Sequence, residues 1–149
     1  MLKDRLLLGG FAGIIAALLA NLTLYFMNIF IPGQNINMPE VTTEIFLNVS
    51  SYTLTHQVLG VIWSTVVGSV YAIFYLITLD LTGWNNLWLK SMMVITGLWL
   101  MGAGFIMKLL ELAQGVRDYP LSILAFFIAH LFFATYLYFF VKKYGIEKA

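Results

Sequence analysis

The chain of 149 residues contains no cysteine. This absence excludes disulfide bonds, a thiolate nucleophile, an iron–sulfur cluster and a zinc site built on cysteine. Charge is also scarce, because Asp, Glu, Lys and Arg make up 10% of the residues, against about 25% in an average soluble domain. The net charge is +1 and the cations are dispersed, so the chain has no basic patch for nucleic acid. We therefore expect no nucleic-acid partner.

Apolar residues fill 61% of the chain and gather in four long runs. A bilayer core about 30 Å thick needs roughly 20 helical residues, and each run reaches that length. None alternates like a barrel strand, and a helix satisfies its own backbone hydrogen bonds in lipid. The first run is too long for a signal peptide. The sequence therefore predicts an all-α, integral membrane four-helix bundle, a single transmembrane domain over residues 1–149 with spans at about 6–30, 53–79, 87–107 and 121–141.

The breaks between the runs carry residues that end helices. Residues 31–40 contain two prolines, a glycine and three amides, and Pro39 is suited to open a short helix through Val49. This helix would lie at the membrane interface or extend the second span. Residues 80–86 are a tight connection, which predicts that the second and third spans form an antiparallel hairpin. Residues 114–120 close the third span, and Pro120 suits a first helical turn.

The basic residues favour one orientation in the membrane. On one side of the predicted spans lie Lys3, Arg5, Lys90, Lys142, Lys143 and Lys148, and on the other lie Lys108 and Arg117. Because Lys and Arg concentrate in cytoplasmic loops, we expect an antiparallel up-down topology with both termini cytoplasmic, in a multi-pass protein of the cell membrane. Lys108 would then lie at the end of a span, where its ammonium group either extends to the outer surface on the aliphatic part of the side chain or pairs with Glu111 one helical turn later.

Small residues recur one turn apart along the predicted spans. Helices in lipid associate through close packing, which small residues permit. The predicted helix-packing residues are Gly9, Gly13, Ala17, Gly60, Ser64, Gly68, Gly97 and Gly104. We expect them to pack the spans against one another within the chain or, as the alternative, to form a seam between two copies.

Polar residues fall on the same helix faces as the small ones. Ionisable groups inside a membrane are costly and mark functional sites, so we expect an inward-facing polar neighbourhood in the outer half of the bundle. Its candidate pocket residues are Asn21, Asn28, His56, Lys108, Glu111 and His130. The other interpretation is that these side chains hydrogen-bond one another or reach the headgroups.

The two histidines raise the question of a cofactor. Two imidazoles can hold haem across a helical bundle, but at 1.5 Å per residue His56 and His130 differ in depth by about 9 Å. Two histidines without nearby carboxylates provide too few ligands for a metal site. We therefore expect no metal and no cofactor, and keep open that a histidine carries protons if water reaches it.

The seven acidic residues are scattered, and only Glu40 and Glu44 lie one helical turn apart. No span carries a carboxylate pair, a histidine cluster or a Ser/His/Asp set, which are the usual marks of intramembrane catalysis. The sequence therefore predicts that the protein is not an enzyme.

The run Gly9-Gly10-Phe11-Ala12-Gly13 with Asn21, followed by His56-x3-Gly60 with Gly68 and Tyr71, resembles uncharacterised four-span bacterial inner-membrane proteins of the YagU and YqhR kind. The likeness covers the first two spans. It implies a bacterial inner membrane and a four-helix arrangement, and it implies no activity or site.

Three functional hypotheses follow. The leading one is a non-enzymatic integral membrane protein, an oligomeric helix-packing or binding subunit with a homo- or hetero-oligomeric partner in the lipid bilayer. The second is a small permease or channel module with an outward-facing polar pocket, which needs assembly because four spans are few for alternating access. The third is a haem-binding membrane subunit.

Overall fold

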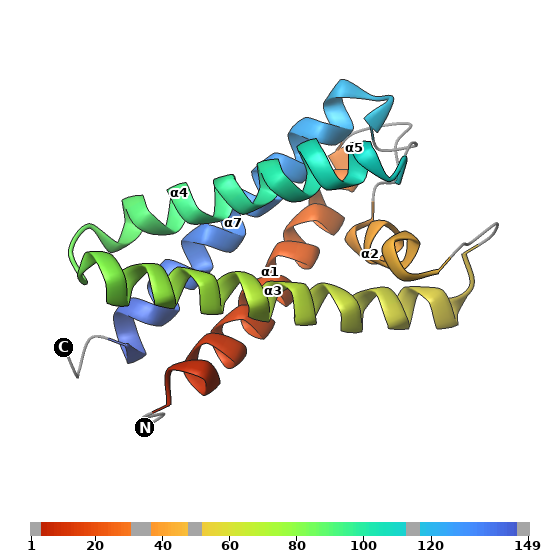
Figure 1. The fold of residues 1–149 in the computed structure, drawn as a ribbon. Helices are drawn as coiled ribbons and strands as arrows, with labels where there is room; N and C mark the ends of the chain where they lie inside the picture. The colour runs from red at the N-terminus through yellow and green to blue at the C-terminus, as the bar shows by residue number, and fades with distance from the viewer. Residues whose placement is uncertain (1–3, 31–36, 48–51, 113–116, 146–149) are drawn as a thin grey trace.

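The computed structural model describes residues 4–30, 37–47, 52–112 and 117–145, which are helical and contain no strand. The elements are α1 (Arg5–Phe30), α2 (Met38–Phe46), α3 (Leu54–Thr82), α4 (Leu87–Trp99), the π-helix η1 (Leu100–Ile106), α5 (Met107–Leu109) and α7 (Pro120–Tyr144). Figure 1 shows α1 and α7 crossing the α3–α4 pair obliquely. Four helices of the described chain, Arg5–Phe30, Leu54–Thr82, Leu87–Leu109 and Pro120–Tyr144, are long and apolar enough to cross a membrane. The prediction of an all-helical chain with four such helices is confirmed.

The helix ends follow local chemistry. Thr53 caps α3, since its side chain and that of His56 exchange hydrogen bonds with the first backbone N–H groups. Proline lies in the first turn of α2 and of α7, where a missing N–H leaves no carbonyl unpaired. Gly83 ends α3 at φ 87° and ψ 163°, a conformation open almost only to glycine. The predicted short helix is α2, and its expected end at Val49 lies outside the described residues.

Small residues let α1 approach α3 closely. A methyl group added at Gly13 would lie 2.5 Å from the Ser69 Cα atom and in direct collision with the Gly68 carbonyl. One added at Gly68 would lie 2.7 Å from the Ala17 Cβ atom. These residues bring the two backbones into contact, which strengthens van der Waals packing where no hydrophobic force drives helices together. The Ser69 hydroxyl adds a hydrogen bond of 3.1 Å to the Gly10 carbonyl.

Helix α4 packs mainly on α7, through the buried residues Leu87, Ser91 and Ile95. The Ser91 hydroxyl donates a hydrogen bond of 2.7 Å to the Ala134 carbonyl of α7. The Tyr75 hydroxyl of α3 donates one of 2.8 Å to the Leu87 carbonyl. Both side chains are fully buried, so each hydroxyl is satisfied by linking two helices.

The expectation that Gly97 and Gly104 pack helices together is wrong within the chain. A methyl group added at either glycine would meet no atom within 4 Å. The physical reason is the position of the neighbouring helix: α4 packs mainly on α7, its buried residues are Leu87, Ser91 and Ile95, and Gly97 lies outside that face. The predicted inward face, which also carried Lys108 and Glu111, is exposed.

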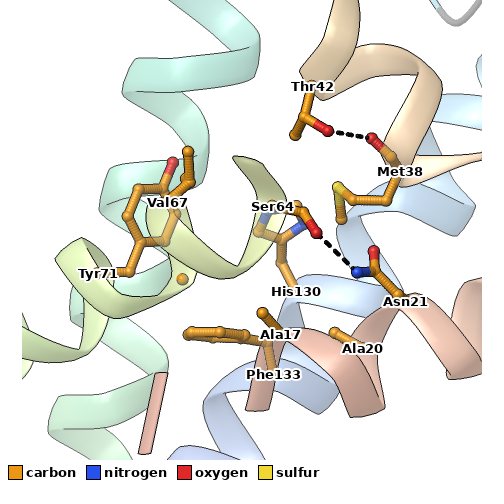
Figure 2. A pocket seen from close by; sticks show the side chains of 11 residues that line it. Ala17, Ala20, Asn21, Met38, Thr42, Ser64, Val67, Tyr71, His130 and Phe133 are labelled. Atoms are coloured by element: carbon orange, nitrogen blue, oxygen red, sulfur yellow. Dashed lines mark hydrogen bonds between the residues drawn. The ribbon is translucent and has the colours of Figure 1, made fainter. Parts of the chain in front are cut away.

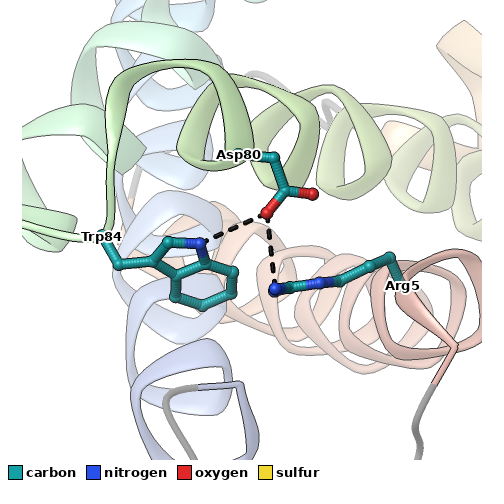
Figure 3. A network of polar contacts seen from close by, with 3 residues as sticks. All are labelled: Arg5, Asp80 and Trp84. Atoms are coloured by element: carbon teal, nitrogen blue, oxygen red, sulfur yellow. Dashed lines mark hydrogen bonds and ion pairs between the residues drawn. The ribbon is translucent and has the colours of Figure 1, made fainter. Parts of the chain in front are cut away.

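One end of the bundle is tied by the first turn of α1 and the α3–α4 connection (Figure 3). Asp80 Oδ1 lies 3.4 Å from Arg5 Nη2 and accepts a hydrogen bond of 3.2 Å from the Trp84 indole. The Arg5 guanidinium also lies 4.3 Å from the Trp84 ring centroid. Lys90 donates hydrogen bonds to the Thr82 and Gly83 carbonyls that end α3. Basic and aromatic side chains therefore gather at this end.

Helix α2 is fastened to the first half of α3. Thr42 donates a hydrogen bond of 2.8 Å to the Gly60 carbonyl, and Thr43 one of 2.9 Å to the His56 carbonyl. A methyl group added at Gly60 would lie 2.6 Å from the Pro39 Cα atom. Gly60 therefore lets α2 lie directly on the α3 backbone.

The connection into α3 adds a further contact to α2. Tyr52 donates a hydrogen bond to the Glu44 carboxylate of α2. Burial, together with this bond to an anion, holds the pKa of the Tyr52 hydroxyl above its ordinary value. The phenol therefore stays protonated and keeps donating over the physiological pH range.

Candidate functional site

A small cavity lies inside the bundle, where α1, α3 and α7 meet the start of α2 (Figure 2). Its volume is about 40 Å³, enough for a few water molecules. The polar side chains that line it are Asn21, Thr42, Ser64, Tyr71 and His130. The rest of the lining is apolar, so these few groups set what the cavity can bind.

Asn21 is the unusual polar residue of this cavity, because its amide is only partly hydrogen-bonded. Its Nδ2 donates a hydrogen bond of 2.8 Å to the Ser64 hydroxyl, which itself donates to the Val61 carbonyl. Figure 2 shows Asn21 and Ser64 meeting between α1 and α3. The Asn21 Oδ1 atom is buried and accepts no hydrogen bond. An unpaired buried acceptor costs about 1–3 kcal/mol, so a residue that lines the cavity carries an oxygen that lacks a donor.

His130 supplies a second acceptor. Its Nδ1 lies 2.8 Å from the Phe126 carbonyl oxygen. A carbonyl accepts only, so Nδ1 carries the proton and Nε2 of the neutral ring keeps its lone pair. The ring lies among aromatic neighbours, 5.5 Å from the Phe126 centroid and 6.2 Å from that of Trp99. Asn21 and His130, which both line the cavity, therefore each carry an unused acceptor atom, a pair that suits a small hydrogen-bond donor.

The other polar lining residues already have partners. The Tyr71 hydroxyl donates a hydrogen bond of 3.3 Å to the Leu98 carbonyl of α4. The Thr42 hydroxyl lies within hydrogen-bond distance of the Met38 and Gly60 carbonyls. These groups shape the cavity and position its walls, whereas Asn21 and His130 retain unused hydrogen-bonding capacity.

A larger groove adjoins this cavity. It has a volume of about 400 Å³ and lies between α1, α2 and the beginning of α3. Asn21 and Met38 line both spaces, and the groove also contains the polar side chains of Asn37 and Gln57. Asn21 and Met38 therefore form the wall that the groove and the cavity share.

The expected gathering of six polar residues in one neighbourhood is not found, because only Asn21 and His130 share the cavity. His56 lies at the start of α3, where its Nδ1 is 3.1 Å from the Thr53 backbone nitrogen. Asn28 donates a hydrogen bond of 3.3 Å to Asn37 Oδ1 at the end of α1. The Nδ1 atoms of His56 and His130 are thus each hydrogen-bonded to a residue three or four positions earlier in the chain.

Lys108 and Glu111 do not pair with each other either. Glu111 adopts φ 54°, and its N–H lies 3.3 Å from the Lys108 carbonyl while the Leu112 N–H donates to the Met107 carbonyl at 2.9 Å. This pair of bonds is the Schellman motif, in which a left-handed residue ends a helix. The chain reversal, and not a pocket, therefore fixes the backbone of Glu111.

Replacing Glu111 with glycine is expected to stabilise the protein. A side chain in the left-handed region costs about 1–2 kcal/mol, and glycine avoids this cost. Glu111→Gly should therefore raise the free energy of unfolding by about 1 kcal/mol, measured by denaturant titration in mild detergent. Glu111→Ala is the matched control, since it removes the carboxylate but keeps the Cβ atom. Equal gains in both variants would contradict the backbone argument.

Several cavity residues were not predicted as site residues. Met38 and Thr42 lie on α2, and the sequence does not say which side of α3 that short helix covers. Phe133 of α7 and Tyr71 of α3 also line the cavity, and their rings meet edge to face with centroids 6.4 Å apart. The sequence did contain one signal for this cavity: Ser64, Gly68 and Tyr71 recur about one helical turn apart and therefore lie on one face of α3.

Within the described residues, no three His, Asp or Glu side chains lie close enough together to hold a metal ion. Comparison of the chain with protein-family models, curated proteins and solved structures gives no match.

Proposed function

We propose that the chain is a non-enzymatic integral membrane protein, a binding subunit whose central cavity holds a small hydrogen-bond donor. One observation carries this proposal: Asn21 Oδ1 is buried without a hydrogen-bond partner, and Asn21 and His130 line the same cavity. Polar groups in membrane helices are kept at a cost in stability and mark sites of function. Water, ammonia or a primary amine from a partner has the required donor and fits the volume.

The proposal places both chain ends in the cytoplasm, with four antiparallel spans in a bacterial inner membrane. The contacts among Arg5, Asp80 and Trp84 support this topology, because they bring the start of α1 to the α3–α4 connection. Gly145 lies at the same end, where an added methyl group would be 3.0 Å from the Trp84 ring. Single cysteines introduced into this cysteine-free chain test the topology. Label at residues 85 and 144, which are both exposed, from the cytoplasmic side only is the expected result.

Asn21→Leu tests the binding site itself. Leucine has the same branching and number of side-chain heavy atoms as asparagine, and it removes the unpaired oxygen. We expect the ligand-free variant to gain about 1 kcal/mol in unfolding free energy, because the cost of that oxygen exceeds the lost bond to Ser64. Thr65→Val, next to Ser64 on α3, is the control, since its hydroxyl is satisfied within its own helix by the Ile62 carbonyl. A loss of stability in Asn21→Leu would mean that the amide only packs.

A second candidate function is a small permease or channel module, favoured by the groove that meets the cavity at Asn21 and Met38. Proteoliposomes containing a pH-sensitive dye distinguish the two functions. A binding subunit gives no proton or ammonia flux above that of empty liposomes. A flux that His130→Leu abolishes would replace the binding proposal with the permease.

The binding subunit is proposed to act in an oligomer. Along the third span only 11% of the most apolar window is buried within the chain, compared with 33–39% along the other three. This exposed surface, with Gly97 and Gly104, is the part of the bundle with most room for a partner helix. Native mass spectrometry in mild detergent tests the assembly, and Gly97→Leu should reduce the oligomer.

A further inference from the structure

A second cavity, of about 360 Å³, lies near the end of the bundle where η1 and α5 meet the beginning of α7. Its apolar wall includes Trp99, Leu100 and Phe126. Three charged side chains also line it, those of Lys108, Arg117 and Asp118. An apolar wall beside a group of charges is the chemistry of an amphiphile, with a polar head and an apolar tail.

Two of the charges are uncommitted. Lys108 and Asp118 are exposed, and neither forms an ion pair or side-chain hydrogen bond within the described ranges. Arg117 lines the cavity and donates a hydrogen bond of 3.2 Å from Nη1 to the Met107 carbonyl. A hydrogen-bonded cation, a free cation and a free carboxylate therefore line one space.

The backbone around the cavity is also unusual. The π-helix η1 forms one wall, and such wide turns recur at functional sites. Gly104 of η1 has open space where a side chain would stand. The Trp99 indole N–H is buried without an acceptor. The first turn of α7 contributes Ile123, so the partial positive charge of that helix end lies close to the two cations.

We propose that this cavity binds one phospholipid whose headgroup carries both a phosphate and a primary ammonium, as in phosphatidylethanolamine. The phosphate matches Lys108 and Arg117, and the ammonium matches Asp118. An acyl chain lies along the wall formed by Trp99 and Phe126. A free phosphate ion leaves this wall and the carboxylate without partners. The site rests on the proposed membrane placement of the chain.

The experiment compares three lipids with identical acyl chains. Protein stripped of lipid in mild detergent is titrated with phosphatidylethanolamine, phosphatidylcholine or phosphatidylglycerol, and native mass spectrometry measures the fraction that carries one lipid. We expect the ethanolamine lipid to bind about tenfold more tightly than the other two, because only it offers a hydrogen-bonding ammonium to the carboxylate. Similar binding of all three lipids would overturn the proposal.

Two variants assign the headgroup contacts. Asp118→Asn should abolish the preference for the ethanolamine lipid over phosphatidylglycerol, and Lys108→Gln should weaken binding of both about tenfold. Lys143→Gln removes a cation from the opposite end of α7 and should leave binding unchanged. Because all three side chains are exposed, unchanged thermal unfolding is expected and is checked in parallel.

Three results would contradict the site. An unchanged preference in Asp118→Asn would exclude recognition of the ammonium. Equal loss in Lys143→Gln would indicate general attraction to the headgroup charge. Displacement of the lipid by inorganic phosphate would identify a free-anion site. The cysteine-labelling pattern reports on the proposed topology independently, so a failure of the lipid site leaves that proposal standing.

Discussion

Replacing Gly13 with leucine is expected to prevent α1 from packing on α3. The new Cβ atom would lie 2.5 Å from Ser69 Cα and would collide with the Gly68 carbonyl. Both are backbone atoms of a helix and cannot turn away as a side chain can, so the helices must separate. We expect a loss of about 3 kcal/mol or more in unfolding free energy. Denaturant titration in mild detergent, followed by tryptophan fluorescence, measures it.

Gly10→Leu is the matched control. Gly10 lies one turn earlier on α1, and a methyl group added there would meet no atom within 4 Å. Both substitutions raise helix propensity by a similar amount, so the difference between the two variants isolates the helix contact. Equal stability of the two variants would show that α1 and α3 do not cross at Gly13.

The four apolar runs were predictable because a span is defined by length and hydropathy, which a sequence displays directly. The packing role of Gly13, Gly60 and Gly68 followed from their spacing, and each of these glycines touches another helix. Gly97 and Gly104 showed the same kind of spacing without the contact. Small size permits close approach, but which face of a span is covered depends on where its neighbours lie.

The candidate site was only partly predictable for a similar reason. The sequence marked Asn21 and His130 as costly polar residues, and both line the cavity. The depth predicted from the sequence grouped Asn28, His56 and Glu111 with these two residues. In the structure each of the three lies at a helix end, outside the cavity. A capping histidine and a left-handed glutamate are set by backbone geometry that hydropathy does not report. The role of α2 could not be derived, because a nine-residue helix carries no span signal.

Gly60→Leu is expected to release α2 from α3 while the α1–α3 crossing stays intact. The new side chain would enter the space of Pro39, whose Cα atom would be 2.6 Å from the added Cβ. The displacement of α2 also breaks the hydrogen bonds from Thr42 to the Gly60 carbonyl and from Thr43 to the His56 carbonyl. The effect is local, because Gly60 lies two turns from the Gly68 contact with α1.

The lack of cysteine makes this release directly measurable. Val41→Cys places a thiol on α2 at a position with 4% exposure, where a maleimide cannot reach it while α2 is docked. Overpacking of about 1–3 kcal/mol should raise the labelling rate about 5- to 150-fold when Gly60→Leu is added. Gly10→Leu in the same Val41→Cys background is the control and should leave labelling slow, because a methyl group added at Gly10 meets no atom within 4 Å. If Gly60→Leu left it equally slow, α2 would not depend on Gly60. The wall that Met38 and Thr42 give the central cavity would then need another anchor.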